Sequence, residues 1–225
     1  ARRVRSMFDA IAPTYELVNR LASVGLDAGW RRSMVRLAGI RPDDRQLDVA
    51  CGTGDVCRTF AAARPAPARI VGGDFAGRML EEARTRNNDR IVWCQADALA
   101  LPFADQSFTL VTCAFGVRNF QSLETGLREM WRVLQPGGRA IILEFGLPST
   151  PMMRRLYHLY FTRMMPWAAT LLSRDRSGAY RYLPRSVLSF HDQAGLASHL
   201  RQAGFGEVAM FPLTRGIVSV FRAHR

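Results

Sequence analysis

One stretch decides the fold of this chain: Leu47-Asp48-Val49-Ala50-Cys51-Gly52-Thr53-Gly54-Asp55. Its apolar half predicts a buried strand, and the glycines after it predict a tight turn into a helix. A second predicted strand, residues 69–73, ends on Asp74, twenty residues after Gly54. In a doubly wound α/β sheet, such glycines let the backbone approach a nucleoside, and the acid accepts hydrogen bonds from the ribose hydroxyls. The stretch therefore predicts a nucleoside site at the edge of a mainly parallel sheet.

The turn also narrows the kind of nucleoside. A dinucleotide fingerprint has a third glycine three residues after the second, which seats a pyrophosphate, but this chain has Cys57 there. Asp55 would repel a phosphate and suits a cationic or zwitterionic ligand, although it could equally cap the following helix. These features favour S-adenosylmethionine, which has a ribose and an adenine but no phosphate. We expect Gly52, Thr53 and Gly54 to carry the backbone past its methionine part.

Strands and helices alternate along the middle of the chain. The predicted strands are 46–50, 69–73, 91–94, 108–114 and 139–145. The predicted helices are 54–63, 76–86 and 122–134, the last stopped by Pro136-Gly137-Gly138. A helix near 192–203 and strands near 206–211 and 216–223 predict a closing hairpin. We therefore expect a Rossmann-like α/β fold whose seven-stranded, mainly parallel sheet has an antiparallel edge strand.

We expect a single domain over residues 1–225. Its expected parts are N-terminal helices at 1–42, a cofactor-binding core at 43–147, a substrate cap at 148–190, and a C-terminal helix and hairpin at 191–225. Large apolar side chains alternate with arginines in 150–190, and Pro166 predicts a kink there. Such a stripe is typical of a core or dimer interface, but it also suits an interfacial helix beside anionic lipid. We favour a cap that forms an apolar tunnel and rests on a membrane.

Charge and cysteine content limit the partners. The net charge is +12, and all 31 basic residues are arginine. The excess is +4 in residues 1–45, zero in 46–147 and +8 in 148–225. A basic face of this kind could meet anionic lipid, nucleic acid or an acidic substrate, or it could simply be solvated. The four cysteines show no ligand spacing and no run of eighteen apolar residues occurs, so we expect a cytoplasmic protein with no metal site and a peripheral contact at the inner face of the membrane.

Several motifs resemble known methyltransferases. Class I methyltransferases share the turn at 49–54, the acids Asp74 and Asp97, and a P-G-G turn, here Pro136-Gly137-Gly138. Narrower motifs are Met7-Phe8-Asp9 with Tyr15 and Asn19, Ala100-Leu101-Pro102-Phe103, Phe115-Gly116-Val117-Arg118-Asn119, Leu143-Glu144-Phe145, Tyr180-Arg181-Tyr182-Leu183 and Leu213-Thr214-Arg215-Gly216-Ile217-Val218. Together, over about residues 4–223, the chain resembles the C-methyltransferases of ubiquinone and menaquinone biosynthesis.

The resemblance implies a cofactor, a substrate and a set of cofactor contacts. It implies C-methylation of a polyprenylated hydroquinone, with S-adenosylmethionine as the methyl donor. Asp97 would accept a hydrogen bond from the adenine amine, with the Ala98 backbone beside it, unless Asp97 only caps a helix. Ala114, also in the cofactor site, stands where many members have a serine, which removes one hydroxyl contact. Glu16 stands where the family usually has an aspartate.

The same resemblance suggests which residues assist the chemistry. A ring carbon becomes nucleophilic when the adjacent hydroxyl ionises, and we expect Arg118 to favour that phenolate. Because an arginine cannot easily act as a base, a water or a histidine would take the proton, and Asn119 would orient the water or the substrate oxygen. Alternatively, Arg118 pairs with an acid such as Glu144. The remaining substrate-side candidates, which could also be packed or surface residues, are Tyr15, Tyr180, Tyr182 and His191.

Other functions stay open at this point. The acceptor could be another phenolic or lipid-like molecule, or the chain could be a non-catalytic, cofactor-binding interaction subunit. Only the charge suggests a nucleic-acid methyltransferase, and the N-P-P-[YF] motif of amine methylation is missing, so we expect no nucleic-acid partner. A homodimer is compatible with the apolar stripe. The residues do not separate a demethylmenaquinol acceptor from a ubiquinol precursor.

Overall fold

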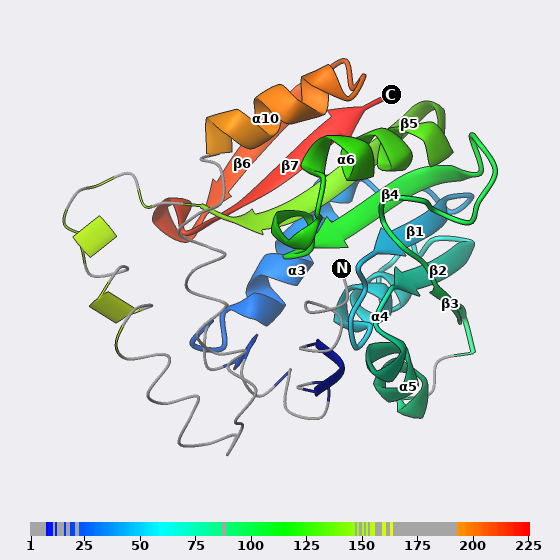
Figure 1. Ribbon diagram of the computed structural model, residues 1–225, viewed down its shortest axis with the longest axis horizontal. Coiled ribbons are helices and arrows are strands. Elements are labelled where there is room, and N and C mark those ends of the chain that lie inside the picture. The colour runs from blue at the N-terminus through cyan, green and yellow to red at the C-terminus, as the bar shows by residue number, and fades with distance from the viewer. Residues whose placement is uncertain are drawn as a thin grey trace.

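A computed structural model describes residues 23–86, 89–146 and 193–225, together with residues 8–10, 12, 16, 19–20, 148, 150, 152, 154–155, 159–160 and 163. Its seven strands form one sheet in the order β3-β2-β1-β4-β5-β7-β6 (Figure 1). The strands are β1 Arg45–Val49, β2 Arg69–Asp74, β3 Ile91–Gln95, β4 Phe108–Ala114, β5 Leu134–Phe145, β6 Val208–Leu213 and β7 Val218–His224. The expected α/β fold with a seven-stranded sheet is confirmed.

The direction of the strands places the candidate site. β1 pairs in parallel with β2 and β4, and the parallel pairing continues from β2 to β3 and from β4 to β5. β7 runs antiparallel to both of its neighbours, β5 and β6, so the reversed strand lies one place in from the edge. The strand order reverses between β1 and β4, and ligands of open α/β sheets bind in the crevice outside the strand ends at such a switch point.

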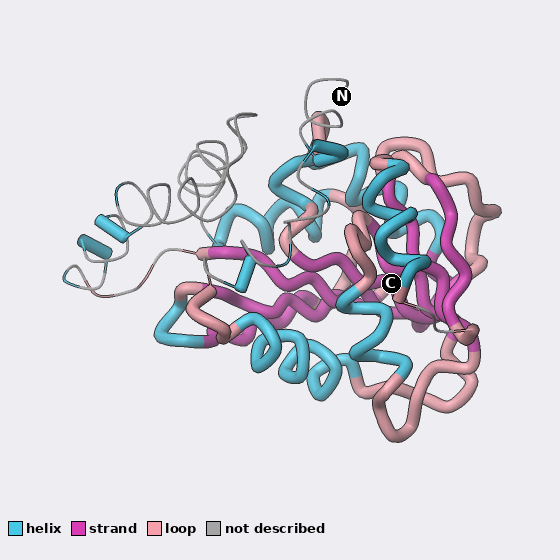
Figure 2. Tube along the Cα trace, turned by 90° about the horizontal axis from the view of Figure 1, so that it is seen from below, coloured by secondary structure: helices cyan, strands magenta, loops and turns pink. Residues whose placement is uncertain are grey.

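Helices cover both faces of the sheet (Figure 2). They are α3 Asp27–Ala38, α4 Asp55–Ala61, α5 Gly77–Thr85, α6 Leu123–Val133 and α10 Gln193–Gln202, with short 3-10 turns η2 Val117–Asn119 and η4 Thr214–Gly216. The predicted helices of the core and the C-terminal part are confirmed within two residues at each end. Of the expected N-terminal helices, α3 is confirmed and the earlier ones fall mainly outside the described residues. None of the helices in the described part of the chain is long and apolar enough to cross a membrane.

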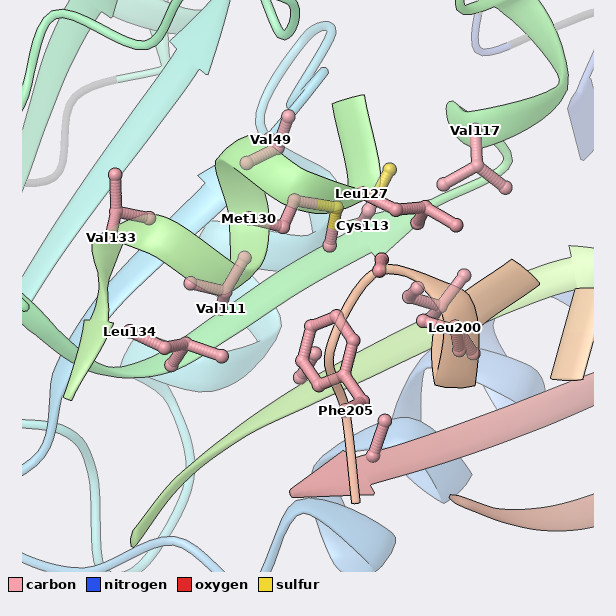
Figure 3. Packing of buried hydrophobic residues seen from close by; sticks show 14 of the residues in the cluster. Val49, Val111, Cys113, Val117, Leu127, Met130, Val133, Leu134, Leu200 and Phe205 are labelled. Carbon is pink, nitrogen blue, oxygen red and sulfur yellow. The ribbon is translucent and has the colours of Figure 1, made fainter. Parts of the chain in front are cut away.

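Two apolar clusters hold these layers together. The first fills the space between the sheet and helices α6 and α10, where Leu127, Met130, Leu200 and Phe205 pack together (Figure 3). The second lies on the other face, where Trp30 and Met34 of α3 belong to one cluster with residues of β4, β5 and β7. Because both faces of the central strands are buried, the strand ends are fixed rigidly at the edge that carries the site.

One expected boundary is wrong. β5 begins at Leu134, directly after α6, and not at residue 139. Phe108 pairs with Leu134 whereas Leu110 pairs with Arg139, so the segment with Pro136-Gly137-Gly138 bulges out of the ladder. The backbone N–H of Gly137 and the carbonyl of Gly138 bond to the C-terminal Arg225 instead. The Pro-Gly-Gly sequence, which is typical of a turn, therefore forms a bulge inside a strand, because this segment pairs with a residue far away in the sequence.

The expected cap lies almost entirely outside the described residues. Of residues 148–190, the structure describes eight positions, all between 148 and 163. The predicted kink at Pro166 and the apolar tunnel therefore stay predictions.

Candidate active site

A cavity that is partly open to solvent lies at the carboxyl ends of the central strands. One group of lining residues follows β2 and β3, and it includes Asp74, Phe75, Asp97, Ala98 and Leu99. A second group follows β4, and it includes Ala114, Phe115, Gly116, Asn119, Phe120 and Gln121. Gly52 lies in the turn after β1, between the two groups. The position of the cavity is typical of a small-molecule site.

Asp74 is held in place by the backbone on both sides. Its Oδ2 accepts a hydrogen bond from the Gly52 N–H at 2.8 Å, and its Oδ1 accepts one from the Ala76 N–H at 2.8 Å. The residue is only 5% exposed, and burial raises the pKa of its carboxyl to about 6. Each carboxylate oxygen has a second acceptor position, which leaves room for two ribose hydroxyls. Asp74 therefore fits the role that the sequence predicted.

Asp97 lies in a turn rather than at a helix start. Its Oδ1 accepts a hydrogen bond from the Leu99 N–H at 2.9 Å, and its carbonyl accepts one from the Ala100 N–H at 3.0 Å. Residues 97–100 form a turn, so the helix-cap alternative is wrong. Asp97 and Ala98 line the cavity beside the apolar side chains of Phe75 and Met79. The two acids and these apolar side chains line the same cavity.

Thr53 and Gly54 support the glycine turn without lining the described cavity. The Thr53 hydroxyl donates to Glu16 Oε1 at 2.9 Å, and Thr53 is 2% exposed. Gly54 has a φ of +88°, and a Cβ there would lie 2.3 Å from the Trp93 ring. A side chain would therefore clash as well as strain the backbone. Of the three predicted turn residues, the structure brings only Gly52 to the cavity.

Asp55, the acid at the start of α4, pairs with two arginines. Asp55 Oδ1 accepts from Arg58 Nη2 at 2.7 Å, and Asp55 Oδ2 lies 3.4 Å from Arg31 Nη1. Asp55 is not among the described residues that line the cavity. The geometry therefore favours a role for Asp55 at the N-terminus of α4 over contact with a ligand cation.

A buried acid beneath the turn, Asp48, is bonded to Cys57. The Cys57 thiol donates to Asp48 Oδ2 at 3.4 Å, and Asp48 Oδ1 accepts from the Thr112 hydroxyl at 2.6 Å. Desolvation raises the pKa of Asp48 to about 7. The network joins α4, β1 and β4 below the cavity. Sequence reasoning missed it, because Asp48 and Thr112 come together only through the pairing of β1 with β4.

Described residues of the N-terminal segment reach the β2–β3 end of the cavity. Phe8 lines the cavity and packs edge-on against Phe75, with ring centroids 6.4 Å apart. Asp9 Oδ1 accepts a hydrogen bond from the Arg78 N–H at 3.1 Å, at the start of α5. Glu16, which receives the Thr53 hydroxyl, also pairs with Arg86. Phe8 was not predicted as a site residue, although its motif, Met7-Phe8-Asp9, was the available signal.

The stretch after β4 is pressed against β1. Gly116 has no room for a side chain, because a Cβ would lie 2.7 Å from Cys113 Sγ and 2.8 Å from Ala50 Cβ. Phe115 has a φ of +56°, which is uncommon for a non-glycine residue, and its N–H donates to the Leu143 carbonyl at 2.7 Å. Strain of this kind persists where the surrounding structure fixes a residue, and it clusters at functional sites.

The two predicted catalytic residues occupy different positions. Asn119 lines the cavity, and its Nδ2 donates to the Phe115 carbonyl at 3.3 Å. Arg118 is not among the described lining residues, and its Nη1 donates to Glu144 Oε1 at 2.7 Å. Its guanidinium carbon lies 5.8 Å from the centre of the Phe115 ring, which does line the cavity. The alternative ion pair with Glu144 is thus present, beside the cavity wall.

The remaining predicted residues include the four substrate-side candidates. Tyr15, Tyr180, Tyr182 and His191 all lie outside the described residues. Their roles stay predictions. Ala114 lines the cavity at the end of β4, and its contact with the cofactor stays a prediction.

Comparison with known proteins assigns the family. A model of the ubiE/COQ5 methyltransferase family matches residues 1–225. The chain is 43% identical over 224 residues to the ubiquinone/menaquinone biosynthesis C-methyltransferase UbiE of Geobacter sp. (strain M21), which covers 97% of this chain and 94% of that protein. It is 45% identical over 205 residues to the demethylmenaquinone methyltransferase of Deinococcus radiodurans, which covers 90% and 84%.

Solved structures agree with the fold. An S-adenosylmethionine-dependent methyltransferase of Thermotoga maritima superposes with a TM-score of 0.66 at 20% identity, covering 97% of this chain and 98% of that one. A second, from Mesorhizobium loti, gives 0.61 at 19% identity, covering 89% and 100%. These structural similarities support the fold assignment alone. With the full-length family match and the two curated relatives, the chain belongs to the ubiE/COQ5 methyltransferase family.

Proposed function

We propose that this protein methylates a ring carbon of a reduced, prenylated quinone, with S-adenosylmethionine as the methyl donor. The observation that carries the proposal is a single cavity with two backbone-supported acids at one end and an aromatic and amide lining at the other. The names of the relatives support the substrate class. When bound, S-adenosylmethionine supplies a methyl group on a positively charged sulfur, which keeps the bonding electrons when the methyl group leaves.

The donor would be held at the β2 and β3 end. Asp74 would accept hydrogen bonds from the two ribose hydroxyls, as charge-assisted bonds. Asp97 would accept from the adenine amine, with the Ala98 backbone beside it. Gly52 would let the backbone approach the methionine part, and Ala114 would flank the donor without a hydroxyl contact.

The acceptor would then lie at the β4 end. Because the strand order is β3-β2-β1-β4, a donor whose adenosine lies at β2 and β3 carries its reacting end toward β1 and β4. Phe115 and Phe120 offer aromatic surface there, and Asn119 and Gln121 offer amide groups. An aromatic ring with a hydroxyl matches both kinds of side chain. Methyl transfer requires the ring carbon, the methyl group and the sulfur in one line, which a pre-formed cavity helps to impose.

The protein assists by favouring the ionised acceptor. The phenolic proton leaves first, and negative charge spreads to the ring carbon that attacks the methyl group. Arg118 would stabilise the phenolate through its positive charge. Among the described lining residues there is no histidine, so we assign the proton to a water oriented by Asn119. A carbon–carbon bond then replaces the ring carbon–hydrogen bond, and each turnover releases one net proton.

We further propose a demethylmenaquinol as the first acceptor to test and a ubiquinol precursor as the second. Two relatives at 44–45% identity are named demethylmenaquinone methyltransferases, whereas those named UbiE carry both pathways in their names. The excess charge of +8 over residues 148–225 supports a peripheral contact with anionic lipid. Flotation with anionic vesicles tests that contact, and failure to bind at low salt would contradict it. A homodimer stays a prediction, for which sedimentation is the direct measurement.

The deciding experiment is transfer of labelled methyl from S-adenosylmethionine to chemically reduced demethylmenaquinone in detergent. Oxidised quinone and total RNA serve as parallel acceptors. Label on a ring carbon of the reduced quinone alone supports the proposal. Absence of label on any quinone, with donor binding intact, contradicts it and favours another phenolic acceptor or a non-catalytic binding role. In a second arm, Arg118→Gln should lower turnover by more than about 10²-fold, to a slow residual rate, and leave donor affinity unchanged.

A further inference from the structure

Glu144 is a buried acid at the end of β5, outside the cavity lining and without a role so far. Its side chain is 0% exposed, and that of its partner Arg118 is 6% exposed. Glu144 Oε1 accepts from Arg118 Nη1 at 2.7 Å and from the Phe145 N–H at 2.9 Å. Its Oε2 receives the Arg118 backbone N–H at 3.4 Å. The carboxylate is therefore bonded to backbone N–H groups of β5 and of η2 as well as to the guanidinium.

The guanidinium of Arg118 is held on one side only. Its Nε is buried and has no hydrogen-bond partner within the described part of the chain. An unpaired buried donor costs roughly 1–3 kcal/mol, more when the group is charged, and Arg222 Nε is the other such guanidinium nitrogen in the described part of the chain.

A second buried pair in the same molecule shows the saturated arrangement. Arg139 donates from Nη1 and Nη2 to the two oxygens of Asp44, at 3.1 Å and 2.6 Å. Its Nε donates to the Ala38 carbonyl, and Nη2 also donates to the Gly39 carbonyl at 2.9 Å. Arg139 is thus bonded at all three nitrogens and joins α3 to the sheet. The fold can satisfy a buried arginine fully, and it leaves Arg118 incomplete next to the cavity.

Neighbouring aromatic rings keep Arg118 at the cavity wall. Its guanidinium carbon lies 5.2 Å from the centre of the Phe145 ring and 5.8 Å from that of Phe115. The two rings are 4.5 Å apart, and Phe115 lines the cavity. A cation over aromatic faces is favoured electrostatically and is kept from water. Arg118 is therefore restrained beside the end of the cavity that would receive the acceptor ring.

We propose that Glu144 is a positioning residue for methyl transfer: it holds Arg118 through Nη1, so that the guanidinium charge stays beside the cavity wall at the acceptor end. The inference rests on the proposed function, because it assigns that positive charge to the ionised phenol. The negative charge of Glu144 also balances Arg118, which would otherwise be a lone buried cation. Glu144 itself touches neither substrate nor donor and acts through Arg118.

The test is a double-mutant cycle on the full-length chain with reduced demethylmenaquinone as acceptor. We expect Glu144→Gln to lower kcat by about 10²-fold, the scale of losing one oriented donor, with the Kd of S-adenosylmethionine unchanged within about twofold. Glu144→Asp keeps the charge and should recover part of the rate. In the Arg118→Gln background, Glu144→Gln should cause no further loss, because Glu144 acts only through Arg118.

Asp44→Asn is the matched control in the other buried pair. It should lower the unfolding temperature and leave kcat unchanged. Independent, multiplying losses in the cycle, or Glu144→Gln with near-normal kcat, would overturn the inference. If Glu144→Gln fails to fold, the Asp variant and the charge-free double variant still decide, since neither leaves a lone buried charge. A wild-type chain that methylates no quinol would instead refute the proposed function.

Discussion

At the β2–β3 end of the cavity, acids accept hydrogen bonds from backbone N–H groups, whereas at the β4–β5 end charged side chains pair with each other. Asp74 is fixed by the Gly52 and Ala76 amides. Arg118 is fixed by Glu144, twenty-six residues away in sequence. The first arrangement depends on local turns and leaves carboxylate oxygens pre-oriented for a ligand. The second depends on packing between strands, which lets a cation approach the cavity without being exposed to solvent.

Asp74→Asn should produce the largest effect on the backbone-held end. The amide cannot accept from both the Gly52 and Ala76 N–H groups, and it loses the charge that favours the ribose hydroxyls. We expect the Kd of S-adenosylmethionine to rise by about 100-fold or more. Calorimetric titration measures this change. Asp97→Asn is the companion, and it should lose less because Asp97 is exposed and accepts one N–H in its turn. Equal losses would show that backbone support does not set the importance of the acid.

Gly116→Ala probes the packed end and should have the next largest effect. The new Cβ would lie within 2.8 Å of both Cys113 Sγ and Ala50 Cβ, so the stretch after β4 must shift. We expect a loss of about 1–3 kcal/mol in the free energy of unfolding, with a higher KM for the acceptor.

Gly29→Ala is the control for this substitution. Gly29 lies in α3, and no atom comes within 4 Å of its added Cβ. Alanine there should stabilise the helix by roughly 0.5–1 kcal/mol. Denaturant titration compares the two variants. Similar destabilisation by both would contradict the close packing of Gly116 as the cause.

The difference between the two ends also explains what could be predicted from sequence. Gly52 and Asp74 belong to one strand–helix–strand unit, β1-α4-β2, so their spacing alone predicted a shared site, and the sheet followed from the alternation of strands and helices. Gly54 was predicted at the same turn, but its contact with Trp93 depends on the pairing of β2 with β3. The Phe8 contact with Phe75 joins residues far apart in the chain, and local patterns carry no information on such distances.

The bulge in β5 shows the same limit. Pro136-Gly137-Gly138 is a turn signal in local terms, yet the C-terminal Arg225 pairs with it and extends the strand. For Arg118, the sequence left open a choice between catalysis and an ion pair. The structure shows that the pair with Glu144 is present and incomplete, which makes the two roles compatible.

The two ends should also differ in pH dependence, with a smaller effect than the substitutions. Burial raises the pKa of Asp74 to about 6, above the value of about 3.9 in an unfolded chain. This group therefore stabilises the ligand-free protein fully below pH 3.9, and that contribution is lost as the pH rises through 6. The affinity for the donor changes with pH in the opposite direction, because the ionised form of Asp74 accepts hydrogen bonds from the ribose hydroxyls. At pH 5 we expect an approximately tenfold higher Kd than at pH 7.5, together with a higher unfolding temperature of the free protein.

Asp48→Asn distinguishes the titration of Asp48 from that of Asp74 in this experiment. Burial raises the pKa of Asp48 to about 7, but Asp48 bonds to Cys57 and Thr112 and not to the cavity. The variant should change the pH dependence of unfolding and keep the loss of donor affinity below pH 6. A Kd that stays constant from pH 7.5 to 5 in the wild-type chain would contradict the assignment of Asp74.

Thr53→Val should have the smallest effect. It distinguishes residues that contact the donor from residues that only support the turn. The buried hydroxyl donates to Glu16 and not into the cavity, so its loss removes one hydrogen bond between the turn and the N-terminal segment. We expect about 1 kcal/mol less stability and a Kd for S-adenosylmethionine that changes by no more than about threefold. Thr53→Ser, which keeps the hydroxyl, should restore the stability. A loss of donor affinity as large as that of Asp74→Asn would instead place Thr53 in direct contact with the donor. The hydrogen bond of Thr53 to the partly exposed Glu16 carboxylate, 2.9 Å long, is too weak to cause so large a loss of affinity.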